Sequence, residues 1–141
     1  MDRQLAERLT QLEASIGELQ GKVDILLPQP MVQVTRAIDF RFTLAIGQGI
    51  RMSEPAPVDG FITEVTMHYP DGCNGLVDLA LKYKNVNVFP LTDYVALNDA
   101  TQTWMIRQPI TKKNPIWVEM RNRDTLNTHT PSVQVVCIGV E

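Results

Sequence analysis

Apolar side chains recur at alternating steps of four and three along the first 27 residues. One heptad register takes in all of them, with Leu9, Ile16 and Val23 at a positions and Leu5, Leu12, Leu19 and Leu26 at d positions. A stripe this narrow is buried only against partner helices. The pattern therefore predicts that residues 1–27 form a coiled-coil oligomerisation helix.

The choice of seam residues bears on the number of helices. β-Branched residues at a with leucine at d are typical of parallel dimers. Arg8 at g and Glu13 at the following e position, on either side of Leu9 and Leu12, instead resemble the short motif of parallel trimeric coiled coils. In such a trimer the arginine methylenes cover the wider seam while the guanidinium reaches the glutamate of the neighbouring helix. We expect a homotrimer, with a dimer as the alternative.

The period of the pattern changes after the helix. Pro28 and Pro30 end it, and residues 28–31 form a proline-rich connector with an extended, stiff backbone. From Val32 to Ile46 apolar and polar residues alternate, which predicts one long half-buried strand. We expect a short continuation at 50–52 and a loop at 53–60, on composition.

Further segments of the remainder read as strands separated by turn signals. They cover residues 61–69, 76–83, 86–89, 103–108, 115–121 and 132–140. With no second helical pattern, seven or eight such strands predict a mainly β head over residues 32–141. The expected fold is an antiparallel β-sandwich, jelly-roll-like, with a closed barrel as the alternative.

Composition and charge narrow the function classes. A hydrophobic content of 44% is that of a folded protein, and the net charge is only −3. The head carries eleven acidic and ten basic residues, so we expect no nucleic-acid partner. No apolar stretch reaches the length of a membrane span, so we expect no membrane insertion. The heptads follow Met1 without an apolar signal region, which favours a protein made in the cytoplasm.

The chain shows no recognisable catalytic or metal-binding motif. His68 and His129 lack ligand-type neighbours and are expected to be solvated surface histidines. Residues 71–75 contain glycines and oxygen ligands but not the calcium-loop pattern, which favours a hairpin turn. Cys73 and Cys137 are expected to be reduced. We therefore expect a protein that is not an enzyme and has no cofactor or metal; a hydrolase with a carboxylate pair at the subunit junction is a minor alternative.

Candidate contact residues gather near the C-terminal end of the chain. In the strand at 115–121, Trp117 shares the polar face with Glu119 and Arg121, as a binding platform, an intersubunit contact, or a side chain covered by a loop. The polar loop that follows is either a recognition loop or a solvated connection. The half-apolar segment 91–102 is expected to pack against the core or a neighbouring chain. The candidate surface contacts are Trp117, Arg121, Arg123, Asn127 and His129.

The order of these parts resembles a known architecture. A short N-terminal coiled coil, a proline connector and a β-sandwich without catalytic signature are similar to trimeric phage and viral spikes, head fibres and capsid decoration proteins. The resemblance implies a structural or adhesive subunit in the virion, assembled in the host cytoplasm. Its partners would be copies of itself and other virion proteins or a host surface. The alternative is a cytoplasmic, trimeric carbohydrate- or protein-binding module of a cell.

Overall fold

The computed structural model describes residues 32–141. The predicted coiled-coil helix, with its seam residues and the Arg8–Glu13 motif, lies outside the described residues, as does the connector. The described part consists of eight strands: β1 (Val34–Arg41), β2 (Gly49–Pro55), β3 (Asp59–Tyr69), β4 (Val77–Tyr83), β5 (Val86–Phe89), β6 (Ala100–Ile110), β7 (Pro115–Asn122) and β8 (Ser132–Val140). The prediction of a mainly β head is confirmed for these residues.

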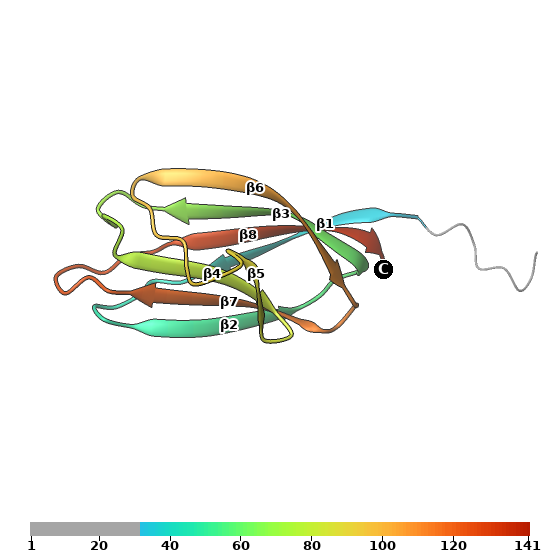
Figure 1. Ribbon diagram of the computed structural model, residues 1–141, viewed down its shortest axis with the longest axis horizontal. Helices are drawn as coiled ribbons and strands as arrows, with labels where there is room; N and C mark the ends of the chain where they lie inside the picture. The colour runs from blue at the N-terminus through green and yellow to red at the C-terminus, as the bar shows by residue number, and fades with distance from the viewer. Residues whose placement is uncertain (1–31) are drawn as a thin grey trace, which may run out of the picture. The chain divides into compact units, whose positions relative to one another are not determined.

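The strands form two antiparallel sheets that pack face to face (Figure 1). Sheet 1 has the order β1-β8-β3-β6, and sheet 2 has the order β2-β7-β4-β5. Every connection passes from one sheet to the other except the one between β4 and β5. This order is that of a jelly roll, so the sandwich is confirmed and the closed barrel is wrong.

The core lies between the sheets, where the inward side chains of the strands are predominantly apolar. On β7 the buried set is Ile116, Val118 and Met120. On β8 the inward residues include Val135 and Cys137, and burial raises the pKa of the Cys137 thiol to about 11. Both cysteines are free thiols in the structure.

The antiparallel order separates the two ends of the sandwich. We call the end where β1 begins and β8 ends the base, and the opposite end the loop end (Figure 1). Four connections gather at the loop end, namely 42–48, 70–76, 90–99 and 123–131. Residue 32, the first described residue, therefore lies at the end opposite these four connections.

The predicted long strand from Val32 to Ile46 is wrong beyond Arg41. The alternation continues in the sequence, but the chain leaves sheet 1 there to reach β2 in sheet 2. Phe42 and Ile46 are consequently 37% and 53% exposed. Leu44 alone stays buried, because it forms an isolated bridge with His129.

Two loop predictions are also corrected. Residues 53–55 and 59–60 belong to β2 and β3 rather than to a loop, since proline is tolerated at the end of an edge strand such as β2. The turn at 71–75 is not a hairpin, because it joins β3 of sheet 1 to β4 of sheet 2. The segment 91–102 packs against the core as expected through Val95 and Leu97, although its last residues start β6.

Candidate recognition surface

The outer face of sheet 2 carries the first group of predicted contact residues. Trp117, Glu119 and Arg121 lie on the outward side of the central strand β7, as the alternation predicts. The register aligns them with residues of β2 and β4 in three rows: Ser53, Trp117 and Lys82; Arg51, Glu119 and Ala80; Gly49, Arg121 and Asp78. The fold thus brings side chains from three distant segments onto one surface.

Glu119 is the centre of one charge cluster on this face. Its carboxylate lies 3.1 Å from Lys82 Nζ and 3.6 Å from Arg51 Nε, and it accepts a 3.0 Å hydrogen bond from the Tyr94 hydroxyl. Burial alone would raise the pKa of Glu119, but the hydrogen bonds from Lys82 and Tyr94 outweigh it and the pKa is lowered. The carboxylate is therefore held in its charged form.

Asp78 is the centre of a second cluster. It is buried on β4, and its carboxylate accepts hydrogen bonds of 2.8 Å from both Arg121 Nε and Arg123 Nε. Arg123 Nη2 adds a contact of 3.1 Å to the other carboxylate oxygen. Arg123 therefore contacts both carboxylate oxygens in a bidentate pair, whereas both contacts of Arg121 are to Oδ2.

Two of these arginines also cover aromatic rings. The guanidinium carbon of Arg51 lies 4.3 Å from the centroid of the Trp117 ring, and that of Arg121 lies 4.7 Å from the Tyr94 ring. These distances are those of cation–π contacts. Trp117 is half-buried, and an arginine of the neighbouring strand covers its ring.

The combined surface is polar, aromatic and richer in cations than in carboxylates. Arg51, Arg121 and Arg123 keep roughly half of their side-chain surface exposed, at 42%, 50% and 44%. A shallow hollow of about 270 Å³ lies between Arg51, Tyr94 and Arg121. The carboxylates of Glu119 and Asp78 are already paired with arginine and lysine side chains of this face. The hydrogen-bonding groups left for a partner are therefore guanidinium donors. Those donors suit an acidic group on a partner.

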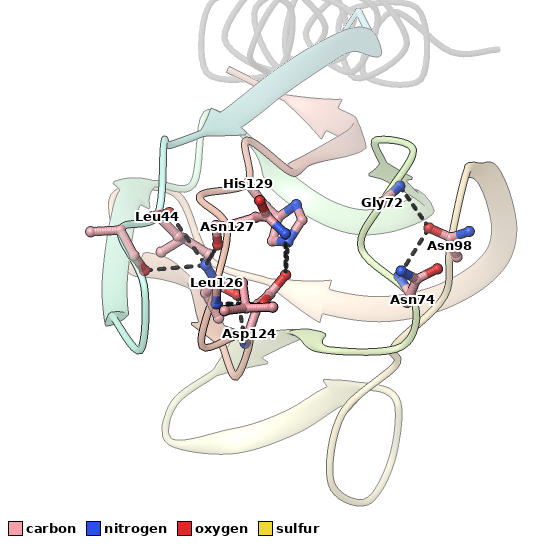
Figure 2. Close-up of polar contacts among 10 residues, drawn as sticks. Leu44, Gly72, Asn74, Asn98, Asp124, Leu126, Asn127 and His129 are labelled. Atoms are coloured by element: carbon pink, nitrogen blue, oxygen red, sulfur yellow. Dashed lines mark hydrogen bonds and ion pairs between the residues drawn. The ribbon is translucent and has the colours of Figure 1, made fainter.

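The second group of predicted contacts belongs to the loop end and has a different role. His129 Nε2 lies 2.8 Å from Asp124 Oδ2, and both side chains are buried (Figure 2). Asp124 also accepts a hydrogen bond from the Leu126 amide. The hydrogen bond with His129 is the largest of several that hold the pKa of Asp124 below its ordinary value. The expectation of a solvated His129 is wrong, because the loop folds back over its own imidazole.

Asn122 ties this loop to the connection between β1 and β2. Its amide nitrogen donates to the carbonyl oxygens of Asn127, Ala45 and Leu44, at 3.0, 3.2 and 3.4 Å. Its amide oxygen accepts from the Asp124 backbone nitrogen at 2.9 Å. The backbones of Leu44 and His129 hydrogen-bond to each other in both directions. Two loops far apart in sequence are thereby joined into one unit.

The other two connections at this end, 70–76 and 90–99, are joined in a similar way. The side-chain oxygen of Asn98 accepts hydrogen bonds from the backbone nitrogens of Gly72 and Asn74, at 3.0 and 2.9 Å (Figure 2). The loops of the loop end are thus shaped by internal hydrogen bonds. Among residues 32–141 no group of three or more metal-ligating side chains occurs.

The structure therefore divides the predicted contact residues. Trp117, Arg121 and Arg123 share the outer face of sheet 2, whereas Asn127 and His129 belong to the loop unit. Sequence reasoning missed Arg51, Lys82, Asp78 and Tyr94, which complete the face. Each lies in a strand or loop whose neighbours become known only from the strand order.

Comparisons with known proteins give a likeness of fold. No protein-family model and no curated protein sequence matches the chain. A pilus subunit from the endospore appendages of Bacillus is 8% identical, with a TM-score of 0.47, over 80% of this chain and 94% of that one. The major capsid protein of bacteriophage PM2 is 13% identical, with a TM-score of 0.45, over 81% and 47%. FLHE is 15% identical, with a TM-score of 0.40, over 76% and 98%.

No helix within residues 32–141 has the length and apolar character needed to cross a membrane.

Proposed function

We propose that this chain is a non-enzymatic structural or adhesive subunit of a virus particle. In this proposal it is a spike, head fibre or capsid decoration protein, assembled as a homotrimer through the predicted coiled coil of residues 1–27. The head is a rigid jelly roll that three chains present together. Three heads on one stalk strengthen contacts that are individually weak, by multivalency.

The observation that carries the proposal is the separation of the two ends of the head. The chain enters the sandwich at the base, whereas four connections gather at the opposite end. The four connections therefore lie at the end of the head opposite the point where the chain enters it. The hydrogen bonds around Asn122 and Asn98 support this role, because a loop held in one shape loses less entropy on binding.

The proposal is tested by breaking the predicted seam in the full chain. Changing both Leu12 and Leu19 to Asp places carboxylates at two d positions, which should abolish association. A matched control changes Gln11 and Ala14 to Asp, which adds the same charges at the outer c and f positions. Sedimentation equilibrium should show trimers for the control and monomers for the seam variant. Trimers of the seam variant would contradict the proposed role of the heptads.

The outer face of sheet 2 supports a second candidate, a cellular trimeric carbohydrate- or protein-binding module. Its aromatic rings and exposed guanidinium groups are the side chains that sugar rings and acidic groups contact. The second candidate predicts that the purified full chain binds members of an array of neutral and sulfated glycans and that this binding is lost on changing Arg121 to Ala. No signal on the array would count against recognition of sugars by this face.

A further inference from the structure

The outer face of sheet 1 changes character halfway along its strands. Antiparallel register aligns four rows across β1, β8, β3 and β6. The two rows nearest the loop end are wholly polar: Arg41, Ser132, His68 and Thr101, then Asp39, Gln134, Thr66 and Thr103. The two rows nearest the base are mostly apolar: Ala37, Val136, Glu64 and Met105, then Thr35, Ile138, Phe61 and Pro109.

Neighbouring side chains in the polar rows hydrogen-bond to one another. Thr66 and Thr103 hydrogen-bond through their hydroxyls at 2.7 Å, and His68 Nδ1 lies 2.7 Å from the Thr101 hydroxyl. Solvated polar rows of this kind are the ordinary outer face of an antiparallel sheet. The apolar rows at the base are the exception.

We call the apolar part the base patch and define it by Phe61, Met105, Val136, Ile138 and Val140. Met105 is 74% exposed, and the three residues of β8 are each partly exposed. A hollow of about 510 Å³ is lined by Phe61, Met105, Ile138 and Val140 of the patch and is bordered by Gln33. A bulge in β3 at Thr63 interrupts the pairing beside it.

The charged groups around the base patch are Arg107, Glu64 and Asp59, together with the ion pair of Arg36 and Glu141 beside Val140. The Arg107 guanidinium lies 4.4 Å from the Phe61 ring centroid, so it covers one side of that ring. Glu64 lies in the row of Met105, and Asp59 borders the hollow. A patch of this composition suits an apolar partner better than a charged one.

The place of the patch indicates what covers it. Gln33 borders the hollow and lies only six residues after Leu27, where the heptads end. Helices in a coiled coil pack about 8–10 Å apart, and six residues span at most about 20 Å. The bases of chains joined by one coiled coil are therefore held within about 50 Å of one another, and each base carries the same apolar patch.

We propose that the base patch is the surface through which the heads of different copies of this chain pack against one another. This inference rests on the homotrimer of the proposed function. A rotation axis brings equivalent patches to the centre of an assembly, so one apolar surface serves every copy. The loop end then lies away from the packed bases.

Oxidation of Met105 by hydrogen peroxide tests the packing in the full chain. We expect Met105 to be protected in the unmodified trimer and oxidised faster in the Leu12→Asp, Leu19→Asp variant. Met52, half-buried in sheet 2, is the internal reference and should react equally in both. An unprotected Met105 in a trimer would overturn the base patch and leave the proposed function intact. A monomeric wild type would overturn both.

A pair of substitutions at exposed apolar residues gives a second test. Met105→Glu places a carboxylate in the patch, whereas Leu126→Glu places one at the loop end, and the two side chains are similarly exposed at 74% and 79%. Because a buried carboxylate must lose its hydration, we expect Met105→Glu to raise the dissociation constant of the trimer about tenfold or more. Leu126→Glu should leave it unchanged. Equal dissociation constants for the two variants would refute the base patch.

Discussion

Asn122 is the residue on which the shape of the loop end depends most. It is 1% exposed, and its side chain hydrogen-bonds to backbone groups of two connections, 42–48 and 123–131. Changing Asn122 to Ala removes two amide donors and one acceptor and leaves buried carbonyl groups without partners. At about 1 kcal/mol for each hydrogen bond, the free energy of unfolding should fall by about 3 kcal/mol. For a head of this size the melting temperature should fall by about 10 °C or more.

Urea unfolding of the full chain followed by tryptophan fluorescence measures this loss. The protein concentration is held equal for all variants, because association contributes to the apparent stability. The matched control is Asn127→Ala, since the Asn127 side chain makes only a 3.5 Å contact with Asp124 while its carbonyl remains in place. The control should lose less than about 1 kcal/mol. If Asn122→Ala loses no more than the control, the loops are not held together by this amide.

Three further outcomes follow from the structure. Gly139→Ala should lower the melting temperature, because a Cβ at this position lies 2.2 Å from the Asp59 carbonyl oxygen, whereas Gly49→Ala, with its nearest atom at 3.7 Å, should cost far less. Because the pKa of Asp124 is lower in the folded chain than its ordinary value of 3.8, the charged carboxylate stabilises the fold at pH values above 3.8. This stabilisation is lost as the pH falls through the lowered pKa. In urea unfolding the stability difference between the wild type and Asp124→Asn should therefore shrink from pH 7 to pH 3; a constant difference would contradict it. Alkylation of Cys137 by iodoacetamide at pH 8 should be slow in the folded chain and fast in urea, because its pKa is raised to about 11.

The parts of the fold that the sequence predicts well are those with strict alternation. Ile116, Val118 and Met120 define the inward side of β7, which places Trp117 and Arg121 outward with no further information. Because successive side chains of a strand point to opposite faces, identifying the buried residues also identifies the outward ones.

The end of β1 shows where alternation fails. Phe42 and Ile46 continue the apolar phase beyond Arg41, although the chain has already left the sheet. A pattern of side chains does not report where hydrogen bonding to a neighbouring strand stops. The departure is set by the crossing to sheet 2, which is a property of the topology.

Only some of the residues of the candidate surface could be predicted from the sequence, for a related reason. Arg51 and Lys82 contact Glu119 because β2 and β4 pair with β7 on either side. The order of strands in a sheet cannot be predicted from the sequence of any one strand. His129 likewise lies in a bridge with Leu44, which is far from it in the sequence. A polar loop looks the same in sequence whether it faces water or folds over its own side chains.

The absolute mass of the unmodified full chain tests the central claim most directly. Light scattering over a range of concentrations should give three times 15.9 kDa, because the heptads and the base patch both act to hold three chains together. A mass of 15.9 kDa at every concentration would contradict the trimer and, with it, the proposed presentation of three heads.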